Sequence, residues 1–330
     1  MLYTAREYIS STRLDVIRTL VRSTRRLLPG RGYTRRFPRL YRAFTSILDR
    51  IVPRSPCIVE VGGHKMYVDP HDHGVDQALI FGGDHEPDQK RLILEFIRPG
   101  MVVFEIGANI GDYTLAFARR CGPAGRVYSF EPSPRTFAVL RRNVELNGYR
   151  NVALVDQAVS DKEGCVRLFE DSESSGNTSL FSGVVPSPAG GIEVPTTTLD
   201  AFVQSNGIDR FDFLKADAQG SEYLILSGAG ECLRRFRPML CLEFWPFGIR
   251  NSGAQPLALL ALLRSLGYTI SILRDGARRT DRLAPSSDEE ILSECHACGD
   301  ERGFCDLLSI PSRSQSGIED RDPAAPLRMT

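Results

Sequence analysis

The sequence predicts an α/β fold in which helices cover both faces of a mostly parallel sheet. Three features carry this prediction: seven strand-like runs in succession, helix-length stretches between several of them, and a glycine-containing turn directly after the first run. Strands that alternate with helices form parallel sheets covered on both faces, because each connecting helix packs back on the sheet.

The seven strand-like runs are rich in β-branched and apolar residues and are separated by turn signals. They comprise residues 102–106, 126–131, 152–156, 212–217, 239–244, 268–273 and 305–310. We expect the last run to pair beside residues 268–273 as an antiparallel strand at the edge of the sheet, because little helix separates the two.

Helix-length stretches follow four of these runs, at residues 112–120, 134–148, 221–236 and 256–267. Apolar spacing from Leu92 to Ile97 predicts a further helix before the first run. Residues 57–70 alternate between apolar and polar around Gly62 and Gly63, which is typical of a β-hairpin.

The chain divides into three expected segments. Residues 1–55 form a basic, helical N-terminal extension, residues 56–310 form the α/β domain, and residues 311–330 form a polar, disordered tail. Two shorter strand candidates within about 163–198 predict an inserted hairpin whose polar loop is mobile.

The basic extension is the one strongly charged part of the sequence. Residues 1–54 carry thirteen arginines against the three acids Glu7, Asp15 and Asp49, and their apolar residues recur at helical spacing. One interpretation is a helix that packs on the main domain. The other is an amphipathic element that contacts an anionic membrane or a partner protein.

The whole-chain composition excludes some functional classes. Lys and Arg balance Asp and Glu at 41 each, so no global field favours nucleic acid as a partner. No run approaches the roughly 18 apolar residues of a spanning helix. The first residues lack the apolar core of a secretory signal, and a cytoplasmic protein is expected. Cys295, Cys298 and Cys305 suggest zinc, but they supply only one closely spaced pair, so no metal is expected.

The turn after the first run reads FEIGANIG, residues 104–111. Gly107 and Gly111 let the main chain turn sharply and approach a ligand, with Ala108 and Asn109 between them. Their spacing differs from the G-x-G-x-x-G of dinucleotide-binding turns. Glu105 ends the run, where a carboxylate suits a cationic, amino-acid-like group better than a phosphate.

Acidic residues also end the next two runs. Glu131 is placed to accept ribose hydroxyls, and Asp156 with Gln157 to hydrogen-bond an adenine edge. A nucleoside with a charged amino-acid tail is S-adenosylmethionine (SAM), which is the cofactor we predict. The alternatives are a nicotinamide cofactor in an oxidoreductase, which the glycine spacing disfavours, and a tight turn without a ligand.

Six ordered stretches resemble the FkbM-type family of SAM-dependent methyltransferases. They are VVFEIGANIGDYT, VYSFEPSP, NVELNG, TTTLDAF, DFLKADAQGSEYLILSGAG and LCLEFWP, and their order and spacing agree with the family over about residues 70–310. The resemblance implies a Rossmann-like class I methyltransferase fold, SAM as methyl donor, and O-methylation of a sugar, glycolipid or secondary metabolite. Two positions depart from the family pattern: Glu105 stands where Asp is more usual, and Gln219 where Glu is usual.

Methylation of an alcohol requires a base that accepts its proton. The candidates lie at the ends of the fourth and fifth runs: we expect Asp217 to be the base or the acceptor anchor and Glu243 to orient the hydroxyl. Lys215 and Glu222 are further candidates, and the alternative for these two residues is an ion pair between them that fixes the loop.

Other possibilities stay open at this point. His71, His73 and His85 are potential bases, with a surface or packing role more common for such residues. The acceptor is expected to be a small molecule or carbohydrate. A non-catalytic SAM-fold module that docks through its Arg-rich N-terminus is the alternative function, and N-methylation stays open beside O-methylation.

Overall fold

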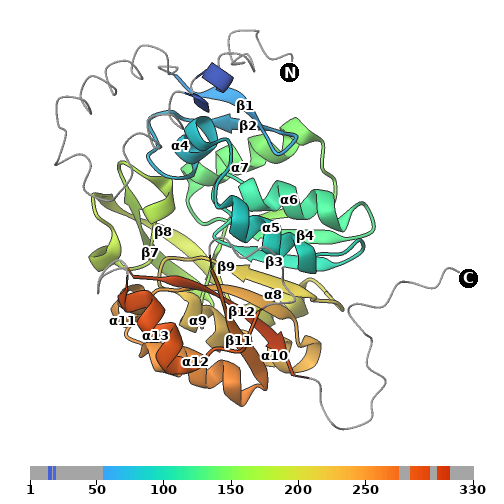
Figure 1. The fold of residues 1–330 in the computed structure, drawn as a ribbon, viewed down its shortest axis with the longest axis vertical. Helices are drawn as coiled ribbons and strands as arrows, with labels where there is room; N and C mark the ends of the chain where they lie inside the picture. Colours follow the sequence, from blue (N-terminus) through green and yellow to red (C-terminus); the bar gives the residue numbers. More distant parts are fainter. Residues whose placement is uncertain (1–13, 17, 20–54, 275–282, 298–302, 313–330) are drawn as a thin grey trace, which may run out of the picture.

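A seven-stranded sheet forms the centre of the protein (Figure 1). The structure, a computed structural model, describes residues 14–16, 18–19, 55–274, 283–297 and 303–312. The strand order is β11-β12-β10-β9-β3-β4-β5. Their bounds are β3 Val102–Ile106, β4 Arg126–Phe130, β5 Val152–Val155, β9 Phe213–Ala216, β10 Met239–Phe244, β11 Tyr268–Leu273 and β12 Cys305–Pro311, which confirms all seven predicted runs.

The expected position of the antiparallel strand was wrong in one respect. β12 does pair with β11, but it also pairs antiparallel with β10, so it lies one strand in from the edge and β11 is the edge strand. A helix, α13 Asp288–His296, separates β11 from β12. This connection lets β12 enter between two strands of the sheet, where Leu307, Leu308 and Ser309 are fully buried.

Helices cover both faces of the sheet, as predicted. Side chains of β3 alternate: Phe104 and Ile106 pack on one face and Val103 on the other. The first face is covered by α8 Leu199–Ser205, α9 Glu222–Ser227, α10 Gly230–Phe236, α12 Pro256–Ser265 and α13. The second face is covered by α5 Pro87–Phe96 and α6 Asp112–Cys121. The short helices are α4 Val75–Gln77, the π-helical turn Ala78–Gly82 and α11 Pro246–Asn251.

The predicted hairpin, β1 Cys57–Val61 and β2 His64–Val68, packs on α7 Pro134–Asn147. Two asparagines one helical turn apart join them. Asn143 Oδ1 accepts from the Tyr67 amide at 2.6 Å, and its Nδ2 donates to Tyr67 O at 3.2 Å and to Ile110 O at 2.8 Å. Asn147 pairs likewise with both main-chain groups of Lys65 at 2.9 and 2.7 Å. These side chains extend the hydrogen bonding of β2 onto a helix.

A second, three-stranded sheet contains the predicted insertion. β7 Gly164–Asp171 and β8 Pro188–Thr197 form an antiparallel pair, and β6 Ala158–Val159 pairs with β8 (Figure 1). Between β7 and β8 lie the short turns η2 Ser175–Asn177 and η3 Ser182–Val184. This insertion stands at the carboxyl edge of the central sheet and contributes to the site described below.

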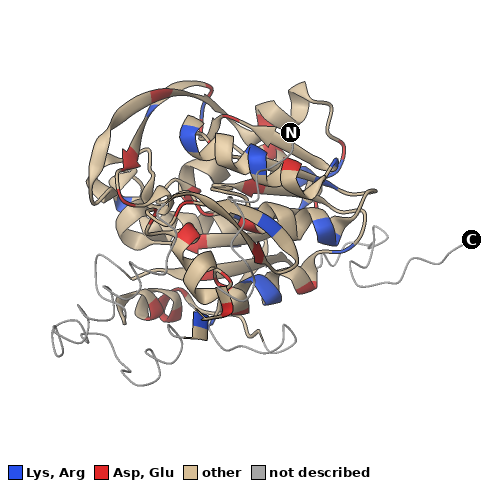
Figure 2. Ribbon diagram, turned by 90° about the horizontal axis from the view of Figure 1, so that it is seen from above, with Lys and Arg blue, Asp and Glu red and all other residues tan. Residues whose placement is uncertain are grey.

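Little of the basic extension is described. Leu14 is buried against the hairpin and α7, and Arg18 donates to Leu79 O at 3.0 Å and Ile80 O at 3.3 Å, so these residues pack on the main domain. Residues 1–13, 17, 20–54 and 313–330 lie outside the described residues, together with the predictions made for them. Over the described ribbon, acidic and basic residues are interspersed (Figure 2). Its helices include none long and apolar enough to cross a membrane.

Replacing Asn143 with leucine is expected to lower the free energy of unfolding by about 2–3 kcal/mol, because buried main-chain groups of Tyr67 and Ile110 lose their partner. Urea denaturation followed by circular dichroism measures this change. Asn147→Leu is the matched control: its side chain is partly exposed, so water replaces the lost bonds and a smaller loss is expected. Equal losses in both variants would contradict the role given to Asn143.

Candidate functional site

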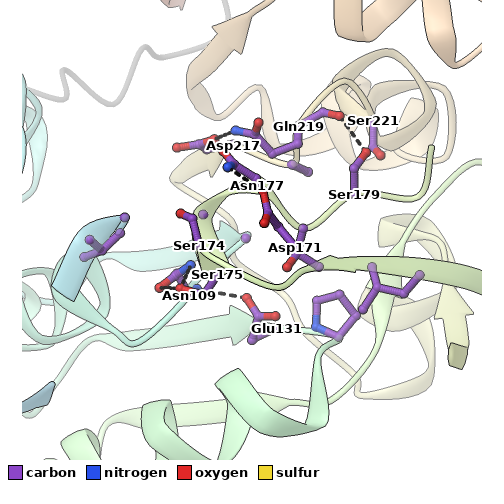
Figure 3. A pocket seen from close by; sticks show the side chains of 18 of the residues that line it. Asn109, Glu131, Asp171, Ser174, Ser175, Asn177, Ser179, Asp217, Gln219 and Ser221 are labelled. Carbon is purple, nitrogen blue, oxygen red and sulfur yellow. Dashed lines mark hydrogen bonds between the residues drawn. The ribbon is translucent and has the colours of Figure 1, made fainter. Parts of the chain in front are cut away.

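A cavity of about 430 Å³ opens where several strands of the central sheet end (Figure 3). In the strand order, β4 and β5 lie on one side of β3, and β9 and β10 lie on the other side. The direction in which successive strands are added therefore reverses at β3. Ligands of open α/β sheets bind at such a switch point, beyond the carboxyl ends of the strands. Residues that follow β3, β4, β5 and β9 line the cavity, together with Glu243 of β10 and the loop of the insertion.

The glycine turn after β3 owes its shape to close main-chain contacts. Gly107 has a φ of 82°, and a Cβ atom there would lie 1.9 Å from the carbonyl oxygen of Asp217. Gly111 has a φ of 95°, and its Cβ would lie 2.7 Å from Leu140 Cδ1. Gly107 therefore lets the ends of β3 and β9 approach, while Gly111 lets α6 pack on α7.

Glu131 connects the turn after β3 with the segment after β4. Its two carboxyl oxygens accept from the main-chain amides of Asn109 and Ser133, each at 3.0 Å. The side chain lines the cavity, but the residue is 6% exposed, and this burial raises the pKa of Glu131 to about 7 although both hydrogen bonds oppose the shift. Glu131 is thus both a brace of the site and a potential hydrogen-bond acceptor in it.

The structure brings four of the eight predicted cofactor residues into the cavity wall: Gly107, Asn109, Glu131 and Gln157. The other four lie elsewhere. Ala108 and Gly111 shape the turn behind the wall, and Asp156 is exposed outside it. Glu105 is buried beneath the turn, where its carboxylate accepts from Thr114 Oγ1 at 2.5 Å and Ser129 Oγ at 3.0 Å. Burial raises the pKa of Glu105 to about 7.

Asp217 and Lys215 form an ion pair at the end of β9. Lys215 Nζ lies 3.1 Å from Asp217 Oδ2 and 4.5 Å from the centre of the Tyr113 ring, and the lysine is buried behind the cavity wall. Burial alone would raise the pKa of Asp217, but the ammonium group beside it holds that pKa below its ordinary value. Asp217 lines the cavity with a side chain that is 30% exposed.

Glu243 and Glu222 differ in what they contact. Glu243 lines the cavity, and burial together with the negative charges of Asp217 and Glu222 raises its pKa well above the ordinary range. Glu222 lies fully buried at the start of α9 and accepts from the amides of Ala218 at 2.7 Å and Gly220 at 3.1 Å. Glu222 therefore fixes the loop after β9 through its main chain, and Lys215 pairs with Asp217 instead of Glu222.

The polar loop of the insertion closes one side of the cavity, which the sequence did not indicate. Ser175 accepts from Asn109 Nδ2 at 3.3 Å, its amide donates to Asp72 Oδ2 at 2.8 Å, and Ser179 Oγ donates to Gln219 O at 2.9 Å. A loop expected to be mobile is thus tied at several points to the rest of the site. The only signal in the sequence is its density of serine and asparagine, which is equally common in surface loops.

Two histidines and a serine also line the cavity. His73 and His85 line the cavity and His71 does not; His85 Nδ1 lies 3.9 Å from both Glu86 Oε2 and Asp112 Oδ2. Ser221 is 1% exposed and lines the cavity, and its hydroxyl has no hydrogen-bond partner among the described residues. Such a hydroxyl is available to a ligand, because a buried polar group without a partner is costly.

The charge of the wall fits SAM and opposes a dinucleotide. Its described residues include no lysine or arginine, and the acids that line it are Glu86, Glu131, Asp171, Glu173, Asp217 and Glu243. A cationic sulfonium is favoured by such a wall, whereas a pyrophosphate would be repelled. The bare main chain at Gly107 and the carboxyl of Glu131 are the groups suited to hold the cofactor.

The predicted absence of a metal concerns a part of the chain that is only partly described. The thiols of Cys295 and Cys305 lie 3.6 Å apart and are buried, while Cys298 lies outside the described residues. Among the described residues, no three histidine, cysteine or acidic side chains are grouped to hold a metal ion.

Comparison with known proteins gives the same assignment as the geometry. The family model of the methyltransferase FkbM domain matches residues 105–270. The 31-O-demethyl-FK506 methyltransferase FkbM of Streptomyces tacrolimicus is 30% identical over 212 residues, which is 54% of this chain and 76% of that protein. The hexuronic acid methyltransferase AglP of Haloferax volcanii is 28% identical over 182 residues, 55% of this chain and 71% of that protein.

Among solved structures, a methyltransferase FkbM of Methylobacillus flagellatus aligns with a TM-score of 0.38 and 16% identity. That alignment covers 63% of this chain and 43% of the other, so this chain spans less than half of that protein's length. The family model, in contrast, matches just over half of the 330 residues, including the glycine turn, Glu131, Asp217 and Glu243. The chain therefore belongs to the FkbM family and is a SAM-dependent methyltransferase.

Proposed function

We propose that the protein transfers the methyl group of SAM to a hydroxyl of a sugar, glycolipid or secondary metabolite, and that Asp217 accepts the proton of that hydroxyl. The names of two relatives support the acceptor class, since one is a methyltransferase of 31-O-demethyl-FK506 and the other of a hexuronic acid. The observation that most supports Asp217 is a carboxylate kept ionised by Lys215 while its side chain is partly exposed in the cavity.

Methyl transfer from SAM does not require the protein to form a covalent bond with either reactant. Bound SAM supplies a methyl group on a sulfonium, which is already a good leaving group. The residues of this chain must then align the acceptor and exclude water. The insertion loop suits the second task, because its buried serines wall off the cavity. Asp217 suits proton transfer, because its pKa lies low enough for the carboxylate to be ionised at neutral pH.

Glu243 suits a different task from Asp217. Its raised pKa favours the protonated carboxyl, which would donate a hydrogen bond to an acceptor oxygen and not remove a proton. The free hydroxyl of Ser221 offers a second contact on the same side of the cavity. We therefore assign Glu243 and Ser221 to acceptor orientation, and Lys215 and Glu222 to holding the loop from behind the wall.

The proposal is tested by adding two components to a cell extract: the protein, and SAM whose methyl group is isotopically labelled. Intact-mass analysis should find products that carry the label, and their fragmentation should place it on an oxygen. Label on nitrogen only would contradict O-methylation. If the protein binds SAM by calorimetry but forms no labelled product in the extract, the result would favour the non-catalytic module.

Affinity for S-adenosylhomocysteine (SAH) is expected to weaken as pH falls through about 7. Glu131 then becomes protonated and accepts ribose hydroxyls less well, because its raised pKa of about 7 places the change in this range. Calorimetry at pH 8 and pH 5.5 should give a roughly tenfold difference in Kd, the size of one charged hydrogen bond. Glu131→Gln should bind about as weakly as the protonated form at both pH values. A variant with the same pH dependence as the native chain would refute the ribose assignment.

Asp217→Asn is expected to slow methyl transfer by roughly 10²–10⁴-fold, the usual contribution of a general base. Formation of SAH in the extract assay measures the rate. The Kd for SAH, measured by calorimetry, should change by no more than about threefold, which is less than the loss of a charged hydrogen bond to the cofactor would cause. Asp209→Asn provides the control, since Asp209 is exposed and precedes β9, whereas the cavity lies beyond the carboxyl end of that strand. Native turnover in Asp217→Asn would remove Asp217 as the base.

A further inference from the structure

A single side-chain amide lies between the two carboxyl groups proposed for catalysis. Gln219 Nε2 donates to Asp217 Oδ1 at 3.3 Å and to Glu243 Oε2 at 3.2 Å, and all three residues line the cavity (Figure 3). The two N–H bonds of one amide group thus hold carboxyl groups from two neighbouring strands.

The main chain of Gln219 adopts a conformation that its side chain does not favour. Its φ is 49°, in the left-handed region that non-glycine residues rarely occupy. The amides on either side, of Ala218 and Gly220, are both held by the buried carboxylate of Glu222, and the carbonyl of Gln219 accepts from Ser179. The surrounding structure therefore enforces this conformation. Enforced strain of this kind concentrates at functional sites.

The loop that carries Gln219 packs closely on α11. Gly220 packs against the main chain of Gly248, where a Cβ would lie 2.5 Å from the Gly248 carbonyl carbon. The loop is therefore packed closely on α11 at Gly220, and the Gln219 side chain makes its two hydrogen bonds to Asp217 and Glu243.

The two carboxyl groups that share the amide have opposite electrostatic surroundings. Lys215 stabilises the ionised form of Asp217, and His85 also favours it. Glu243 faces the acids Asp217, Glu222 and Asp306, and burial and these charges favour its protonated form. The buried Asp306, opposite Glu243 in the β10–β12 register, itself has a pKa raised to about 8 by burial, with Glu86 and Asp217 adding to the shift.

We propose that Gln219 is a positioning residue whose neutral amide holds Asp217 and Glu243 together and leaves Asp217 as the ionised member of the pair. This inference rests on the proposed function. A third carboxylate at this point, the residue type that the family pattern usually has here, would compete with Asp217 for the stabilisation that Lys215 provides. The glutamine instead donates to both carboxyl groups and adds no charge.

The proposal is testable without knowledge of the acceptor. SAH and sinefungin share their adenosyl and amino-acid parts, but sinefungin carries a protonated amine on the carbon that replaces the sulfur. The ratio of their Kd values, SAH over sinefungin, thus measures how strongly the site attracts a cation beside the sulfur position. We expect the native chain to prefer sinefungin at both pH 8 and pH 5.5 because Asp217 is ionised throughout this range, with a smaller preference at pH 5.5, where Glu131 is protonated.

Gln219→Met keeps the side-chain length but removes the donor. The ratio should fall about tenfold, equivalent to about 1.4 kcal/mol, because Asp217 is no longer held in place. Gln219→Glu should make the ratio rise more steeply with pH than it does in the native chain, because the added carboxylate raises the pKa of the cluster into the measured range. Gln204→Met and Gln204→Glu are the matched controls, since Gln204 is an exposed glutamine of α8, and both should keep the native ratio.

Affinity for SAH separates this inference from the proposed function. A native chain that binds neither compound would refute the SAM site. Variants that bind SAH normally, and therefore fold, but keep the native ratio at every pH would refute the role of Gln219 and leave the proposed function intact. Equal losses of affinity for both compounds would indicate a purely structural role and would also overturn the inference.

Discussion

The contact between the main chains at Gly107 and Asp217 is the constraint on which the site depends. With Gly107 in place, the carbonyl of Asp217 lies where any other residue would have its first side-chain atom. The Asp217 amide also donates to Ile106 O at 3.1 Å, so the ends of β3 and β9 are joined at this point. Because both loops start from this junction, the residues after β3 that we propose for the cofactor and those after β9 that we propose for catalysis share one cavity.

Buried and partly buried carboxyl groups surround that junction, and they differ in the kind of group that contacts them. Glu105 is held by hydroxyls, Glu131 and Glu222 by main-chain amides, and Asp217 by the ammonium of Lys215. Burial raises the pKa of the first three to about 7, whereas the ion pair lowers that of Asp217. A cluster of acids can therefore contain one group that is firmly ionised at neutral pH, and the position of a single lysine decides which one it is.

The departure from the family pattern at Gln219 acquires a physical meaning in this setting. Glu222 does not replace the missing carboxylate, because both of its oxygens are engaged by the loop main chain. What occupies the usual position of an acid is an amide that bonds to two other acids. Because nitrogen stands here in place of a carboxylate oxygen, this position donates hydrogen bonds and adds no negative charge to the acids that line the cavity.

The sequence was sufficient for the seven strands and for the end of the sheet at which the cavity lies. Apolar periodicity located all seven strands, and the glycine turn with Glu131 located the end of the sheet where the cavity lies. It failed for β12, which entered the sheet one strand from the edge. This error concerns what lies beside a strand, which local pattern does not specify.

By itself the sequence determined which residues form strands and turns and which acids end those strands, because periodicity and glycine chemistry are local properties of the chain. Only the tertiary structure decided which acid faces Lys215, that the insertion loop closes the cavity, and that Gln219 lies between two carboxyl groups. These relations join segments far apart in the sequence, and their energies depend on burial and distance, which exist only once the chain has folded.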